Sequence, residues 1–168
     1  MLIIALFILG LASRLTPHLA NFSPIIAIAL FSGAYLNKKY SLWLPIVLYV
    51  ISDLIIGLHG VVLFTWGSVF LITLLGKRLK RNQSLVTNLS YAAISSVIFF
   101  IVTNLGVWLG GWYPRTINGL IQCYTLAIPF FRTSLVSNVF YMLVLLGTYE
   151  FVSKKVPSRK AKLALLSN

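Results

Sequence analysis

The sequence predicts an all-α, polytopic membrane protein, a six-helix transmembrane bundle that forms a single domain over residues 1–168. Three observations support this prediction: 59% of the residues are hydrophobic, only 10% are charged, and the mean hydropathy is +0.94. A soluble domain carries roughly 25% charged residues. Here, apolar runs of about 15 to 20 residues follow one another with short breaks, which is the pattern of helices that cross a bilayer.

The charge balance and the cysteine content exclude other classes of protein. Lys and Arg number 14 against two acids, a formal net charge of +12, but the basic residues form short clusters between apolar segments. This distribution is typical of residues that anchor helices at a membrane surface, so we expect a lipid bilayer and no nucleic acid as partner. One cysteine allows no internal disulfide, and no Cys/His spacing indicates a zinc site. We expect no cofactor.

The first three helices are expected at residues 1–15, 22–36 and 41–58. The first segment resembles the apolar core of a signal peptide, but it has no basic start and no cleavage site of small residues, so we expect it to be retained. At about 1.5 Å per residue, it is short for a bilayer of about 30 Å. Pro24 falls in the first turn of the second helix, where its missing N–H needs no partner. Gly57 ends the third helix.

The other three helices are expected at residues 61–76, 89–109 and 133–152. A basic run ends the fourth helix, and a polar link leads to the fifth, which a glycine pair and a proline then break. Residues 110–132 contain prolines and a glycine but also many apolar side chains, so we expect a partly buried cap loop there. The tail, residues 153–168, is basic and is expected in the cytoplasm.

Lys and Arg are divided unequally between the two predicted sides of the bundle. Eleven of the 14 lie in the tail and in the loops after the second and fourth helices, whereas Arg14, Arg115 and Arg132 lie in the other three loops. Cytoplasmic loops carry the excess of basic residues. Both termini are therefore expected in the cytoplasm, in agreement with an even number of crossings.

The unusual polar and aromatic residues gather in the three loops on the non-cytoplasmic side. A charge at the centre of a bilayer costs on the order of 2.5 to 3.5 kcal/mol, so its position needs a reason. Small-molecule sites are concave and mostly apolar, with a few polar groups. The sequence therefore predicts a substrate-binding site in these loops. The candidate residues are Arg14, His18, Asn21, Asp53, Asn104, Trp108, Tyr113, Arg115, Cys123 and Tyr124.

Each candidate also has a structural role open to it. Asp53 could pair with Arg14 or Arg115 or cap a helix as readily as it could contact a ligand. His18 fits a packed, hydrogen-bonded residue, and the aromatic candidates fit an interfacial belt at least as well as a stacking platform. Cys123 fits a small buried apolar residue, or a thiol that coordinates a soft metal centre.

Catalytic and metal motifs are not evident. Two histidines and one acid come from separate loops, with no spacing that indicates a metal site. The sequence has no Ser/His pair at a recognisable spacing, no HExxH and no phosphate-binding glycine loop, so we expect no enzyme activity. Ser134, Asn138 and Tyr141 fall on one face of the last helix, which predicts hydrogen bonds between helices.

Four motifs resemble those of a known family. They read Arg14-x-x-Pro17-His18-x-x-Asn21-Phe22-x-Pro24, Ser52-Asp53, Thr103-Asn104-x-Gly106-Val107-Trp108 and Tyr113-Pro114-x-Thr116-x-x-Gly119-Leu120-x-x-Cys123-Tyr124. Together they resemble a family of small bacterial inner-membrane proteins that are described as transport proteins and whose function is not characterised. That family often has two prolines after the histidine and an acid at the start of the last helix. Here Leu19-Ala20 and Asn138 stand in those places.

The layout is similar, more distantly, to the S components of energy-coupling-factor vitamin transporters, which are six-helix proteins of this size. The resemblance implies capture of substrate at the outer face by the candidate residues, and reorientation alone or with an energy-coupling ATPase module. The small residues that dock S components are not matched, since Ala5, Gly10 and Ala12 lack the required spacing. Some relatives of S components carry cobalamin and use a cysteine thiol, and the resemblance suggests a similar role for Cys123.

We therefore expect a substrate-binding protein of the bacterial inner (plasma) membrane. Its function would be uptake of a small vitamin-like or metal-chelating molecule captured at the non-cytoplasmic face. The alternative is a non-transporting membrane scaffold or accessory subunit whose polar loops dock partner proteins.

Overall fold

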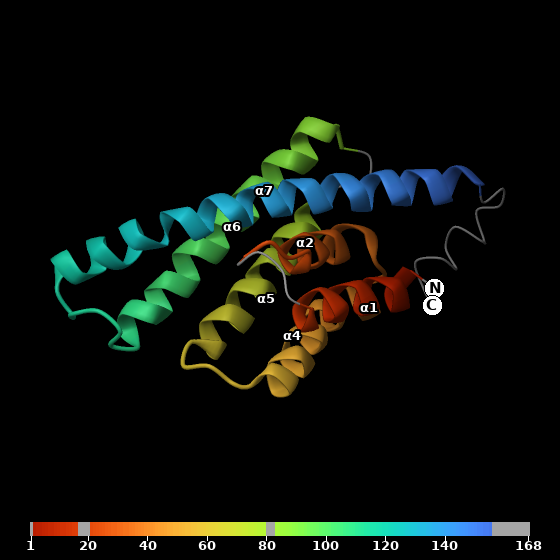
Figure 1. Ribbon diagram of the computed structural model, residues 1–168. Helices are drawn as coiled ribbons and strands as arrows, with labels where there is room; N and C mark the ends of the chain where they lie inside the picture. The colour runs from red at the N-terminus through yellow and green to blue at the C-terminus, as the bar shows by residue number, and fades with distance from the viewer. Residues whose placement is uncertain (1, 17–20, 80–82, 156–168) are drawn as a thin grey trace.

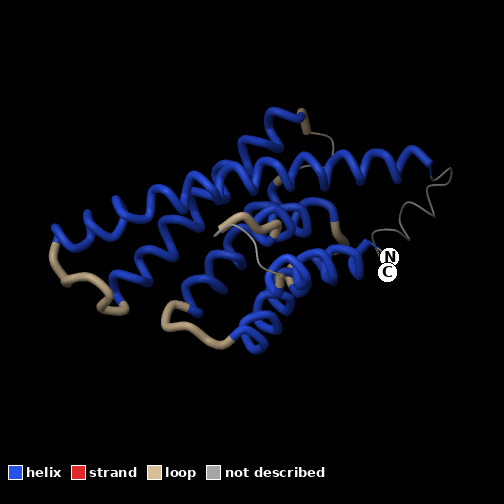
Figure 2. Tube along the Cα trace, in the orientation of Figure 1, coloured by secondary structure: helices blue, strands red, loops and turns tan. Residues whose placement is uncertain are grey.

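All regular secondary structure is α-helical in the parts that the computed structural model describes, which are residues 2–16, 21–79 and 83–155 (Figure 2). Six helices of at least 11 residues confirm the predicted all-α class and the number of helices. A single turn of four residues lies between the second and third of them. In chain order the elements are α1 (Leu2–Leu15), α2 (Ile25–Tyr35), α3 (Lys38–Ser41), α4 (Trp43–Ile56), α5 (Val62–Arg78), α6 (Leu85–Leu109) and α7 (Ile117–Lys155).

Helix α6 begins one turn earlier than the predicted residue 89. Ser84 is its N-cap, because the Ser84 Oγ accepts a hydrogen bond from the Thr87 N–H at 3.1 Å. Such a cap satisfies one of the backbone donors that the first turn leaves free. The side-chain nitrogen of Asn88, which is buried, donates to the Ser84 carbonyl at 3.0 Å. The polar link that the sequence indicated here is therefore the capped first turn of the helix.

The predicted cap loop over residues 110–132 and the start of the last helix at residue 133 are wrong. Helix α7 runs without interruption for 39 residues, with Pro129 inside it, and Figure 1 shows it along the length of the bundle. Thr116 begins the helix, because its Oγ1 accepts from the Gly119 N–H at 3.1 Å. At membrane depth a helix satisfies its own backbone, whereas a lipid-exposed loop does not, and membrane helices tolerate proline.

Helix α2 lies at the centre of the molecule, between α1 and α7 in Figure 1. All 11 of its residues are buried. A helix that is apolar all round is stable only when neighbours cover every face, and α2 contacts α1, α4, α5, α6 and α7. At about 16 Å, from 1.5 Å per residue, it is too short to cross a bilayer by itself.

A close helix contact joins α2 to α5 through two glycines. A Cβ atom on Gly33 would lie 2.9 Å from the Gly76 Cα, and one on Gly76 would lie 3.1 Å from the Gly33 Cα. Only hydrogen fits in either place. Small residues that let backbones approach are the usual means of packing helices where lipid removes the hydrophobic drive between them.

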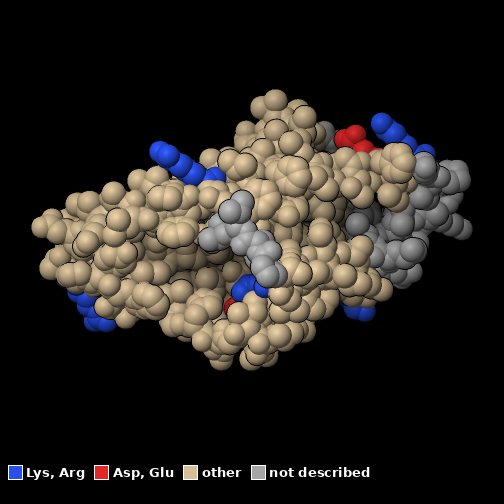
Figure 3. Space-filling model, viewed as in Figure 1, with Lys and Arg blue, Asp and Glu red and all other residues tan. Residues whose placement is uncertain are grey.

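The distribution of polar and apolar residues is that of a membrane protein. Large apolar side chains cover the outside, as the mostly uncharged surface in Figure 3 shows, while serine, threonine and asparagine side chains are buried inside. Asn138 of α7, fully buried, donates to the Ala92 carbonyl at 2.6 Å and to the Ser96 Oγ at 3.1 Å, both on α6. The hydrogen bond between helices predicted for Asn138 is thereby confirmed.

Three helical segments are long and apolar enough to cross a membrane, in the part of the chain that the structure describes. They are Lys38–Ile56, Leu85–Leu109 and Ile117–Lys154. At about 1.5 Å per residue, α7 is about 58 Å long and exceeds the bilayer core of about 30 Å. Of the predicted basic tail, residues 153–155 belong to α7 and the rest lies outside the described residues.

The glycine contact predicts that Gly33→Ala lowers the stability of the protein. The new methyl group would meet the α5 backbone, and overpacking of this kind typically costs about 1 to 3 kcal/mol. Thermal unfolding in mild detergent should show a lower Tm than the wild type. Gly67→Ala is the matched control, because a Cβ there meets nothing within 4 Å and alanine favours a helix by up to about 1 kcal/mol. Equal Tm values for the two variants would contradict the close contact.

Candidate functional site

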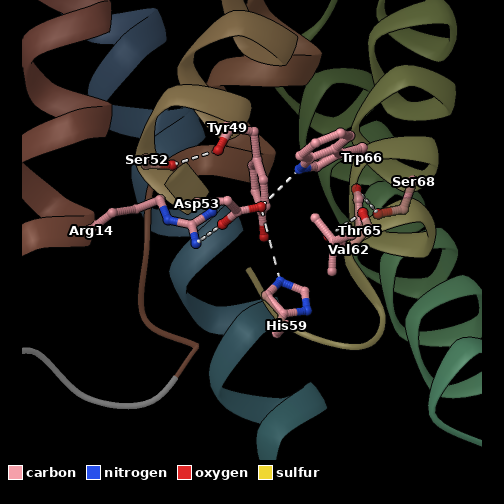
Figure 4. A network of polar contacts seen from close by, with 9 residues as sticks. All are labelled: Arg14, Tyr49, Ser52, Asp53, His59, Val62, Thr65, Trp66 and Ser68. Atoms are coloured by element: carbon pink, nitrogen blue, oxygen red, sulfur yellow. Dashed lines mark hydrogen bonds and ion pairs between the residues drawn. The ribbon is translucent and has the colours of Figure 1, made fainter. Parts of the chain in front are cut away.

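Asp53 lies in the last turn of α4 and is almost fully buried, at 1% exposure. A carboxylate near the C-terminus of a helix faces the negative end of the helix dipole. It also lies within one of the segments that can cross the membrane. Both effects oppose its charge, so Asp53 depends on partners from other elements, which Figure 4 shows around it.

Three side chains surround the Asp53 carboxylate. Arg14, in the last turn of α1, donates from Nη2 to Oδ1 at 2.5 Å, and Trp66 of α5 donates from Nε1 to Oδ2 at 2.7 Å. The Nε2 atom of His59, in the loop between α4 and α5, lies 3.9 Å from Oδ2. The carboxylate therefore joins α1, α4, α5 and the loop that connects the last two (Figure 4).

The guanidinium of Arg14 is held in one orientation and is only partly used. Its central carbon lies 4.1 Å from the centre of the Tyr49 ring, in a cation-π contact. The second terminal nitrogen, Nη1, is buried and has no hydrogen-bond partner among the described residues. A buried donor without a partner costs about 1 to 3 kcal/mol, more when it is charged. Arg14 thus presents a fixed, unsatisfied donor.

Arg14 lines a cavity of about 210 Å³. Its wall combines side chains from α1, α4, α6, α7, the first turn of α2 and the segment that precedes α2. Ser23 in that segment has a buried Oγ that, like Arg14 Nη1, lacks a partner among the described residues. Two residues of one cavity wall, Arg14 and Ser23, therefore each hold a buried polar atom that has no partner among the described residues. The polar and aromatic residues of this wall are Arg14, Asn21, Ser23, Tyr49, Phe99 and Ser134.

A second cavity of about 150 Å³ adjoins the first. The two share Asn21, Phe99 and Ser134 in their walls, and the rest of the second wall consists of Phe100, Phe130 and Phe131 together with Thr103, Asn104 and Ala127. The space-filling view shows a hollow in the middle of the face drawn, with basic and acidic atoms at its edge (Figure 3). Both cavities have mixed polar and apolar walls, and the second holds more aromatic rings than the first.

The structure brings part of the predicted site together. Arg14 and Asn21 line the first cavity, and Asn21 and Asn104 line the second. Asp53 lies behind Arg14, so the ion pair with Arg14, one of the roles considered for this acid, is present. His18 lies outside the described residues.

The other five predicted residues lie near the connection between α6 and α7 and line neither cavity among the residues described. Four of them bond to backbone carbonyls, and Tyr113 is half-buried in the connection itself. Arg115, in particular, bonds to α6 rather than to Asp53. The bonds are Trp108 Nε1 to Pro114 O at 3.0 Å, Arg115 Nη2 to Leu109 O at 2.9 Å, Cys123 Sγ to Asn104 O at 3.5 Å and Tyr124 Oη to Ile101 O at 2.7 Å.

Sequence reasoning missed several residues of the site. Trp66 could have been found, because an indole inside a membrane helix needs an acceptor and Asp53 is the acid nearest to it in the sequence. Ser23 and Phe99 carried no signal, since serine before a helix and phenylalanine within one are both ordinary. Ser134 was expected only to bond between helices, yet it lines both cavities.

The described residues contain no group of three or more His, Cys, Asp or Glu that could hold a metal ion. Cys123 is buried at 2% exposure, as expected for a small apolar residue. The chemistry that these residues offer to a ligand is hydrogen bonding from Arg14 and Ser23, together with contact to aromatic rings.

The fold and the site define a multi-pass, all-α membrane protein with a buried ion pair and two adjoining cavities. The chain belongs to the family of unknown function DUF6580, which it matches over residues 1–160. It matches no curated protein and no solved structure. The likeness to S components therefore rests on the layout of helices and polar loops in the sequence alone.

The ion pair predicts that Asp53→Asn destabilises the protein strongly. It would leave the Arg14 charge buried without its partner, and breaking a buried pair in this way costs about 3 to 5 kcal/mol. The double variant Arg14→Met/Asp53→Asn removes both charges and should unfold at a higher temperature than Asp53→Asn alone. Thermal unfolding of the single and double variants measures the coupling. Losses that simply add would show that the pair is not a unit.

Proposed function

We propose that the protein is a substrate-binding membrane transport protein that captures a small molecule in the two adjoining cavities. The observation that carries this proposal is that Arg14 and Ser23, which both line the first cavity, each hold a buried polar atom, Nη1 and Oγ, without a partner among the described residues. Folded proteins pair nearly all buried polar atoms. Two unpaired atoms beside one cavity are therefore best explained by a ligand that completes their hydrogen bonds.

The basic residues support capture from the non-cytoplasmic side. Lys38 and Lys39 lie between α2 and α4, at the ends of those helices away from Asn21 and Asp53, and Lys77 and Arg78 end α5. The cavity lies instead where α1 and α4 end and α2 begins. Because cytoplasmic ends carry the excess of Lys and Arg, the cavity would face the other side.

The size of the site favours a small substrate. Volumes of about 210 and 150 Å³ correspond to roughly seven and five water molecules at about 30 Å³ each. A vitamin-like molecule is of this size, and the S-component resemblance supplies an energy-coupling ATPase module as the partner that would drive uptake. The wall, partly aromatic with few polar groups, is typical of small-molecule sites.

Native mass spectrometry of the protein in mild detergent tests the proposal. The wild type should carry a small molecule that Ser134→Leu loses, because leucine at this position, which is 7% exposed and lines both cavities, would fill them and remove a hydroxyl. Ser90→Leu is the matched control, since Ser90 is exposed on α6 and lines neither cavity. It should retain the molecule.

A different result would favour the alternative function, a non-transporting membrane scaffold or accessory subunit. The spectra of the wild type and both variants could all show the same partner protein and, apart from it, only lipid. That result would mean that the cavities are not a capture site. In that case the variants would also support normal growth of cells that depend on the protein.

A further inference from the structure

We propose that the molecule bound in the cavities is a small organic monocarboxylate with an apolar or aromatic part. Its carboxylate accepts hydrogen bonds from Arg14 Nη1 and Ser23 Oγ in the first cavity, and its apolar part lies against the phenylalanines of the second. This inference rests on the proposed function and names the class of substrate.

The two unsatisfied groups match a carboxylate. Arg14 Nη1 is a charged donor that belongs to a rigid, planar fork, and the fork suits the two oxygens of a carboxylate. The Ser23 hydroxyl donates one further hydrogen bond. Both groups are buried and unpartnered among the described residues. An acceptor bound in the cavity would offer each of them a partner.

The charges around the cavity favour an anion and limit its charge. Asp53 is turned away from the ligand, because Arg14, Trp66 and His59 surround its two oxygens. No acid belongs to the described walls of either cavity. The guanidinium is therefore the charge that a ligand meets first. Since Asp53 already offsets part of it, a single negative charge is matched better than the double charge of a phosphate.

The wall of the second cavity indicates the chemistry of the remaining part of the ligand. Phe99 lies between the two compartments, and Phe130 and Phe131 extend the aromatic wall beyond it. The rings of Phe100 and Phe131 lie 4.9 Å apart, so the wall is itself packed and fixed in place. Such a wall gains free energy by covering an apolar group and gains little from a fully polar one. An inorganic anion alone would leave this compartment unfilled.

Calorimetry on the purified full chain, freed of bound molecules, tests this class with phenylacetate, its neutral counterpart phenylacetamide, and inorganic phosphate. Phenylacetate should bind at least about tenfold more tightly than phenylacetamide, because a hydrogen bond to a charged group exceeds a neutral one by roughly this factor. Phosphate should bind more weakly than phenylacetate. Phosphate as the tightest ligand, or equal binding of acid and amide, would overturn the proposal.

Two variants test the residues. Ser23→Ala removes a hydroxyl with no partner among the described residues, so it should leave the fold intact and weaken phenylacetate about fivefold. Arg14→Lys keeps the charge beside Asp53 but loses the fork, and should weaken binding more than about tenfold. Ser90→Ala, outside both cavities, should bind as the wild type does. Unchanged affinity in Ser23→Ala and Arg14→Lys would overturn the proposal.

The molecule that co-purifies with the wild type separates this inference from the proposed function. If it is lost in Ser134→Leu and contains a carboxylate, both stand. If it is lost in Ser134→Leu but contains no carboxylate, the substrate class is wrong and the capture function remains. If the wild type carries no small molecule and binds none of the three probes, both are wrong.

Discussion

The need to neutralise one carboxylate inside a lipid-facing bundle organises this structure. Asp53 sits where the end of its own helix and the membrane both oppose its charge. The structure meets that demand with Arg14, Trp66 and His59, which come from α1, α5 and the loop before α5. Arg14 uses one terminal nitrogen for Asp53, and the other is buried without a partner among the described residues. The stability of the bundle and the proposed binding function thus depend on the same ion pair.

The packing of α2 places the second unsatisfied group. The contact between Gly33 and Gly76 holds α2 against α5, and burial on all sides leaves α2 no freedom to slide. Ser23 and Pro24 precede its first turn, so their position follows from that of the helix. Ser137 of α7 fixes this segment from the other side, since its hydroxyl donates to the Ser23 carbonyl at 3.1 Å. The Ser23 hydroxyl is thereby held at the cavity wall.

The sequence was a good guide to the helices and a partial guide to the site. Apolar runs between basic clusters located six helices, because lipid requires such runs wherever a chain crosses it. They could not locate the start of α7, since proline and glycine break helices in water more readily than in a bundle surrounded by lipid. The same error explains why the sequence placed Tyr113 and Arg115 in the site. A helix from residue 117 to residue 134 covers about 26 Å, which separates Tyr113 and Arg115 from Ser134, whereas a loop could have folded back over Arg14.

The enclosure of α2 also bears on how the protein is made. A ribosome releases α2 before α4, α5, α6 and α7, which are the helices that later cover it. Because α2 is too short to span a bilayer, it has no stable position in the membrane before those helices are made. Lipid or the insertion machinery must therefore cover the first part of the chain until α5 has been synthesised, about 40 residues later. Only then can Gly33 and Gly76 come into contact. For this chain we therefore expect the insertion of α2 to be coupled to its packing against α5.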